Sequence, residues 1–120
     1  LIAEALKINQ SLTTLDIRNN SIGDEGAKFI ADALNFNQSL ATLHLEDNSV
    51  GEEGAKFIAE ALKSNHTLST LHLRNNFIGP NGAQCIADAL KINQSLTTLD
   101  IENNDIEGGV KFIAEALKIN

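Results

Sequence analysis

The sequence predicts an α/β solenoid, a horseshoe arc with a parallel sheet on its concave side and helices on its convex side. A first observation is a leucine that recurs every 28 residues, as Leu12, Leu40, Leu68 and Leu96. A second is the alternation of apolar and polar residues after each of these leucines, which is typical of a strand with one buried face. A third is the helical spacing of apolar residues later in each unit. About four 28-residue repeats, each with one strand and one helix, explain all three observations.

Each repeat opens with one template, which in the first copy reads Leu12-x-x-Leu15-x-Ile17-x-x-Asn20-x-Ile22. The template returns at 40–50, 68–78 and 96–106. Leu15 and Ile17 alternate with polar residues, so we expect a short strand with its leucines in the core. The asparagine after the strand has an amide that can satisfy buried backbone groups of the turn and of the next repeat. We therefore expect a structural role at Asn20, Asn48, Asn76 and Asn104.

The helix of each repeat follows a Gly-x-x-Gly-Ala segment, and in the first copy Ala27, Ile30 and Leu34 follow helical spacing. The helix begins near Asp24, Glu52 or Pro80, where a carboxylate meets the positive end of the helix dipole and proline loses no hydrogen bond. The fourth copy is one residue shorter at 106–109. An asparagine follows each helix, and we expect it to adopt the left-handed conformation that ends helices. These residues are Asn9, Asn37, Asn65, Asn93 and Asn120.

The repeats form one predicted domain over residues 1–120, which we expect to be a piece of a longer protein. Residues 1–11 are the helix end of a preceding repeat, and the repeats are 12–39, 40–67, 68–95 and 96–120. The terminal units carry the same apolar pattern as the interior units, so we expect both ends to expose core residues. Residues 6–20 match 90–104 except that Arg18 corresponds to Glu102. One molecule's end can therefore stack on another's, and we expect a homo-oligomer.

The repeat template, its 28-residue length and its full helix resemble the ribonuclease-inhibitor-like subfamily of leucine-rich repeats, which also occurs at the C-terminal end of NOD-like receptors. The resemblance covers the whole chain. It implies a scaffold that binds a protein partner whose identity the repeats do not specify. Ribonuclease inhibition is not implied, because that inhibitor is rich in cysteine and tryptophan, whereas this chain has one cysteine and no tryptophan.

Charge and composition exclude several classes of partner. The net charge is −7, and the nine Lys and Arg residues form no basic run, so we expect no binding to nucleic acid or to anionic membranes. No stretch approaches the roughly 20 apolar residues of a membrane span. The single cysteine, Cys85, suits a reducing compartment, and we expect a cytoplasmic protein.

Three columns of polar residues are predicted on the concave face, because equivalent residues of paired strands lie about 4.8 Å apart. The first column is threonine throughout. In the third column we expect each charge to be compensated by an opposite neighbour in the same column. The second column is Asp16, His44, His72 and Asp100, and the third is Arg18, Glu46, Arg74 and Glu102.

These columns are open to two interpretations. One is a solvated surface in which compatible polar residues lie side by side. The other is a binding face for a polar protein partner, with contacts from the second and third columns. Phe77 joins this candidate set, because its equivalents Ser21, Ser49 and Asp105 are polar and an aromatic residue is therefore expected on an exposed loop.

Metal binding and catalysis are less favoured. His44 and His72, flanked by Asp16 and Asp100, have the side-chain types of a zinc site, but a flat sheet does not easily direct four ligands into a tetrahedron. Thr70, His72 and Asp100 have the side-chain types of a nucleophile, a base and an orienting group, yet threonine recurs in that column in every repeat. We therefore expect a protein-binding or recognition module with no enzymatic activity, cofactor or metal. The alternative is a structural segment that self-assembles without a separate ligand.

Overall fold

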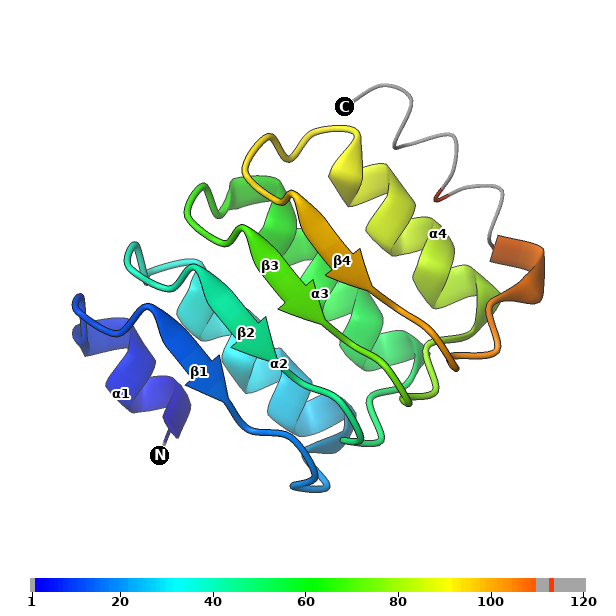
Figure 1. Cartoon of the computed structure of the whole chain (residues 1–120), viewed down its shortest axis with the longest axis horizontal. Helices are drawn as coiled ribbons and strands as arrows, with labels where there is room; N and C mark the ends of the chain where they lie inside the picture. The colour runs from blue at the N-terminus through cyan, green and yellow to red at the C-terminus, as the bar shows by residue number, and fades with distance from the viewer. Residues whose placement is uncertain (1, 110–112, 114–120) are drawn as a thin grey trace.

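The computed structural model describes residues 2–109 and residue 113, and it confirms the predicted strand-helix repeats. Figure 1 shows the strands side by side in one layer and the helices in a second layer. The elements are, in order, α1 (Ile2–Ile8), β1 (Thr14–Asp16), α2 (Gly23–Leu34), β2 (Thr42–His44), α3 (Glu52–Ser64), β3 (Thr70–His72), α4 (Gly79–Leu90), β4 (Thr98–Asp100) and the 3₁₀ turn η1 (Glu107–Gly109). The predicted helix of the fourth repeat and Asn120 lie outside the described residues, apart from Ile113.

The sheet is parallel throughout, with the strand order β1-β2-β3-β4. Each strand is paired in a register of 28 residues, so Leu43 lies between Leu15 and Leu71. We call the side of the sheet opposite the helices the concave face. The repeat length therefore sets which side chains become neighbours on this face.

The core lies between the sheet and the helices. Leu43, Leu45 and Leu71 point inward from the strands and are fully buried. From the helix layer, Ala55 and Ile58 are also fully buried, so both small and branched residues pack between the helices and the sheet. The alternation of buried leucines with half-buried polar residues explains why such short strands form.

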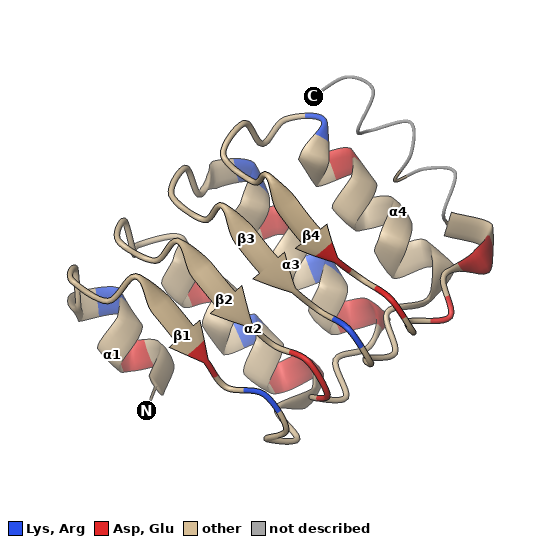
Figure 2. Ribbon diagram, in the orientation of Figure 1, with Lys and Arg blue, Asp and Glu red and all other residues tan. Residues whose placement is uncertain are grey.

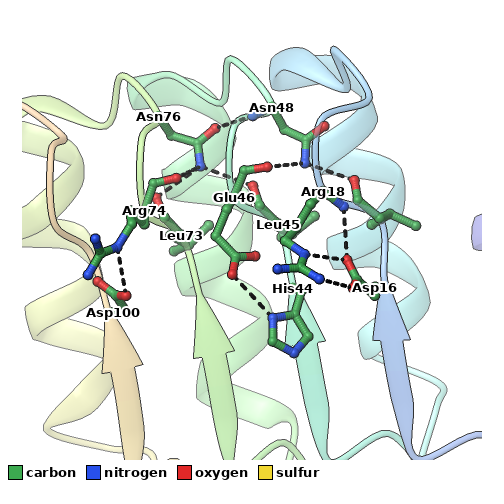
Figure 3. Close-up of polar contacts among 11 residues, drawn as sticks. Asp16, Arg18, His44, Leu45, Glu46, Asn48, Leu73, Arg74, Asn76 and Asp100 are labelled. Carbon is green, nitrogen blue, oxygen red and sulfur yellow. Dashed lines mark hydrogen bonds and ion pairs between the residues drawn. The ribbon is translucent and has the colours of Figure 1, made fainter.

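The asparagines that follow the strands have the structural role that the sequence predicts. Asn76 is buried, and its Oδ1 accepts hydrogen bonds from the backbone N–H groups of Asn48 and Val50 at 3.0 and 2.9 Å. Its Nδ2 donates to the carbonyl oxygens of Leu45 and Leu73 at 3.0 and 2.9 Å. One amide thus links two repeats, and Asn48 repeats the arrangement one unit earlier (Figure 3).

The prediction of left-handed asparagines at the helix ends is wrong for the described residues. Asn65 has φ −78° and ψ 131°, and none of the helix-end asparagines that the structure describes, which are Asn9, Asn37, Asn65 and Asn93, is among the residues of positive φ. Its amide is instead buried, where Nδ2 donates to the Leu34 carbonyl at 2.9 Å and Oδ1 accepts from the Leu68 N–H at 2.8 Å. Left-handed residues instead follow the strands, at Asn19, Asp47, Asn75 and Asn103 and at Ser21, Ser49 and Asp105.

Asp24 supports the helix of the next repeat. The sequence places this carboxylate at the start of its own helix, α2. In the structure Asp24 Oδ1 accepts hydrogen bonds from the backbone N–H groups of Gly51 and Gly54, at 2.6 and 3.0 Å, where α3 begins. A Cβ at Gly54 would lie 2.7 Å from this oxygen, so glycine permits the close approach. The first turn of α3 is therefore capped from the preceding repeat.

Candidate protein-binding surface

The concave face brings together eight of the nine sequence-predicted site residues. The parallel register pairs Asp16 with His44, His44 with His72, and His72 with Asp100. The third-column residues lie two positions after the last residue of each strand, on the same side of the sheet. We call this set the concave polar surface, and its members are Asp16, Arg18, His44, Glu46, His72, Arg74, Asp100 and Glu102.

The ion pairs of this surface differ from the prediction for the third column. Arg18 pairs with Asp16 on its own chain segment, with a contact of 2.6 Å between Nη2 and Oδ2 (Figure 3). Glu46 forms an ion pair with neither arginine among the described residues, so compensation along the third column holds only where Arg74 contacts Glu102 at 2.8 Å. Residues i and i+2 of an extended segment share a face about 6.6 Å apart, against about 4.8 Å for neighbours across strands, and the long side chain of arginine spans either distance.

Arg74 joins two acidic residues of the next repeat. Its Nε donates to Asp100 Oδ2 at 3.1 Å, and its Nη2 lies 2.8 Å from Glu102 Oε2. Figure 2 shows acidic and basic residues interspersed along the segments that follow the strands. The face therefore carries fixed charges of both signs.

These contacts shift the protonation of the acidic residues. The hydrogen bonds from the Arg18 side chain and backbone lower the pKa of Asp16 to about 2. Partial burial opposes ionisation of Asp100, but hydrogen bonds from the Glu102 backbone and the Arg74 side chain outweigh it and lower the pKa. Both carboxylates are therefore ionised at neutral pH, and their negative charges hold the arginines in place.

The centre of the surface contains His44, Glu46 and His72. The two imidazole rings stack with centroids 4.5 Å apart, and His44 Nδ1 lies 3.2 Å from Glu46 Oε1. The residue pattern predicts one shared face for these residues but not the His44–Glu46 contact. A signal exists in the spacing, because Glu46 lies two positions after His44, as Arg18 does after Asp16.

Phe77 lies on the loop between β3 and α4, separate from the second and third columns. It is 65% exposed, in agreement with the polar residues at equivalent positions. Its backbone N–H donates to the Val50 carbonyl at 2.7 Å, and Phe77 forms an isolated parallel β-bridge with Gly51. Unlike Ser21 and Ser49, Phe77 is not in the left-handed region. The backbone hydrogen bond of Phe77 thus fixes the position of an exposed aromatic side chain on this loop.

Comparison with known proteins identifies the repeats. A family model described as Leucine Rich repeat matches residues 9–31, 36–59, 64–87 and 93–112. The chain belongs to the leucine-rich repeat family. A comparison with curated proteins finds no match. The leucine-rich repeats of this chain contain no helix that is long and apolar enough to cross a membrane, among the residues described.

Two solved structures share the fold of these leucine-rich repeats. One is titled "Leiomodin-1 Actin-Binding Site 2 (ABS2)", with 31% identity and a TM-score of 0.89, over 98% of this chain and 71% of that chain. The other is the tropomodulin C-terminal domain of Caenorhabditis elegans, with 15% identity and a TM-score of 0.60, over 99% of this chain and 93% of that chain. The second likeness shows the fold alone, whereas the first extends to the sequence.

Proposed function

We propose that this leucine-rich repeat chain is a non-catalytic protein-binding module, that it binds through its concave face, and that actin is a partner. The observation that carries the proposal is the likeness to the leiomodin-1 actin-binding site, at 31% identity over 98% of the chain. Because fold alone does not determine function, we assign the contacts to specific residues, those of the concave polar surface.

The arginines are suited to this role. Their side chains are 49% exposed at Arg18 and 43% exposed at Arg74, so each has surface that a partner can cover. Asp16 and Asp100 already restrict them, which reduces the entropy lost on binding. Arginine is also enriched among the residues that dominate binding energy. Phe77 adds an exposed aromatic side chain to the proposed contacts.

Binding through this face should depend on salt. The proposed contacts are charged and exposed, and interactions between exposed charges are screened above about 0.1 M salt. We propose the same nine residues as contacts that the sequence indicates: Asp16, Arg18, His44, Glu46, His72, Arg74, Phe77, Asp100 and Glu102.

Fluorescence anisotropy with labelled actin monomers tests the proposal. We expect Arg74→Glu to weaken binding by about tenfold, since loss of one interface arginine costs on the order of 1–2 kcal/mol. Lys63→Glu is the matched control, because Lys63 lies on α3 and pairs with Glu60 on the helix layer. Equal affinity of Arg74→Glu and wild type would reject the concave face, and no binding of wild type would reject actin.

Self-association is a second candidate, and one observation favours it. At the β1 end of the solenoid, an apolar hollow of about 460 Å³ is lined by Ile17, Ile22, Phe29 and Ile30 together with Ile2 and Ala3. The outer edge of β1 has no paired strand among the described residues, and such an edge invites pairing with another chain. A second copy stacked end to end would cover both.

Light scattering coupled to gel filtration, over a range of concentrations, separates the two candidates. Ile22→Glu should reduce the mass of any oligomer, because it places a charge in the apolar hollow. The same variant should leave binding through the concave face unchanged. A wild-type chain that remains a 12.9 kDa monomer at high concentration would exclude self-association.

Two finer assignments follow from the same residues. The 28-residue repeats with full helices, such as the 13-residue α3, support membership of the ribonuclease-inhibitor-like subfamily. The single cysteine and an actin partner both support a cytoplasmic location.

A further inference from the structure

The centre of the concave polar surface brings three potential ligand groups close to one another. His44 and His72 come from the paired strands β2 and β3, and their rings are nearly parallel, with 4° between the planes. Glu46 follows on the same side of the sheet, with Oε1 3.2 Å from His44 Nδ1 (Figure 3). One ligand atom from each of the three residues lies within 4.8 Å of the other two.

Glu46 has a carboxylate oxygen with no hydrogen-bond partner. Glu46 Oε2 is buried and unpartnered among the described residues, and the side chain as a whole is 14% exposed. A buried carboxylate oxygen is costly unless a donor or a cation binds it. The flanking carboxylates differ, because Asp16 is held by Arg18 and Asp100 by Arg74. Glu46 is thus the carboxylate of this surface whose unpartnered oxygen is buried, among the described residues.

We propose that His44, Glu46 and His72 bind one Zn²⁺ ion, with water as the fourth ligand. Zinc accepts imidazole nitrogen and carboxylate oxygen at about 2.0–2.2 Å, and tetrahedral geometry then separates ligand atoms by about 3.4 Å. The ligand atoms of the three residues lie within 4.8 Å of one another, so they must approach by up to about 1.4 Å. The stacked rings are parallel and their nitrogen lone pairs lie in the ring planes, so the imidazoles must also rotate to direct both nitrogens at one ion. All three side chains are partly exposed, which permits this rotation.

A zinc site at this position needs three protein ligands and not four. A flat sheet does not easily direct four side chains, Asp16 and Asp100 beside the two histidines, into a tetrahedron. In the structure both aspartates form ion pairs with arginines, and Glu46 is the carboxylate beside His44. Three side chains from two neighbouring repeats are therefore sufficient to bind the ion. Three protein ligands and one water form a common zinc arrangement.

Charge and ligand type favour a divalent transition metal. Around neutral imidazoles, four carboxylates and two guanidinium groups leave a local net charge of −2, from Asp16, Glu46, Asp100, Glu102, Arg18 and Arg74. Two imidazole ligands suit Zn²⁺, whereas Mg²⁺ and Ca²⁺ prefer oxygen ligands throughout. This inference goes beyond the proposed function, because it requires no protein partner.

Calorimetric titration with zinc chloride alone, in a buffer that does not chelate zinc, tests the site. We expect one Zn²⁺ per wild-type chain. His72→Gln and Glu46→Gln should each weaken binding by at least about tenfold, the lower limit for loss of a group that merely orients a metal ligand. Circular dichroism shows whether each variant retains its fold. Titration with magnesium chloride should give no competing heat.

The matched control changes the other groups of the chain that zinc prefers. His66 is exposed and lies outside the cluster, and Cys85 is a free cysteine on α4. The double variant His66→Gln/Cys85→Ser should bind zinc as tightly as wild type. The proposal is overturned if wild type takes up no zinc, if the double variant loses binding, or if a folded His72→Gln or Glu46→Gln variant binds as wild type does.

Discussion

At the scale of single residues, the concave face shows how an exposed carboxylate is fixed by its neighbour two positions along the strand. Arg18 donates to both carboxylate oxygens of Asp16, at 2.9 and 2.6 Å, and its backbone N–H adds a third contact at 3.3 Å. A carboxylate that accepts several hydrogen bonds is stabilised in its charged form. The pair therefore behaves as one rigid unit at neutral pH.

A direct prediction concerns the protonation of Asp16. Its pKa, about 2 in the folded chain, should rise toward the ordinary value of 3.8 in Arg18→Gln. Because the folded pKa is lowered, the pair stabilises the fold above about pH 4, and this contribution is lost as the pH falls toward 2. Carboxyl carbon shifts followed by NMR during an acid titration measure both values.

Arg74→Gln is the control for this titration. It should raise the pKa of Asp100, which Arg74 contacts, and leave that of Asp16 unchanged. A titration of Asp16 that is the same in wild type and Arg18→Gln would show that the ion pair does not persist in solution.

At the scale of elements, neighbouring repeats are joined by asparagine side-chain amides, which hydrogen-bond to backbone groups. The Asn65 side chain joins the end of α2, through the Leu34 carbonyl, to the segment before β3, through the Thr67 and Leu68 N–H groups. A left-handed helix end requires only a residue that tolerates a positive φ, such as glycine. The arrangement at Asn65 requires a side chain that both donates and accepts hydrogen bonds.

Two substitutions of Asn65 distinguish these explanations. Asn65→Ala should lower the free energy of unfolding by about 2 kcal/mol, because buried backbone groups lose their partners. Asn65→Gly should be at least as destabilising, although glycine would be tolerated or favoured at a left-handed position. Urea unfolding followed by circular dichroism gives both values. A glycine variant as stable as wild type would refute the role of the amide.

The same comparison shows what the sequence can predict at this scale. The strands, the helices and the structural role of Asn48 and Asn76 follow from a repeat whose pattern of burial is visible in the residue types. The conformation of Asn65 was mispredicted, because left-handed ends and side-chain caps both favour asparagine. The partner of Arg18 cannot be predicted from spacing alone, because its long side chain reaches both an acidic residue two positions away on its own segment and one on the next repeat.

At the scale of the whole molecule, burial is graded along the solenoid. Leu71 in β3 is fully buried, whereas Leu15 at the same position in β1 is only partly buried. Both leucines pack against the same layer of helices, but within the described part of the chain β1 has a neighbouring strand on one side only. In a solenoid each repeat contacts only adjacent repeats, so stability should be greatest in the interior.

Matched truncations test this gradient. Leu71→Ala should lower the free energy of unfolding by about 3 kcal/mol, as expected for a fully buried leucine. Leu15→Ala should cost less than half as much, because less apolar surface is lost from the core. Denaturant unfolding of both variants provides the comparison. Equal losses would indicate that the first repeat is covered in solution, as end-to-end association would achieve.

The Asn48 and Asn76 amides also have a consequence for how such a protein can evolve. Each amide serves the backbone of its own repeat and of the one before it, and the partners of the two amides in the preceding repeats occupy equivalent positions, as Ile17 and Leu45 do. A duplicated unit inserted in frame would therefore find every hydrogen-bonding partner it requires already present on both sides. The arc can grow or shrink by whole units, each adding about 4.8 Å of sheet, whereas a change of length between a strand and its asparagine would move the amide away from its partners.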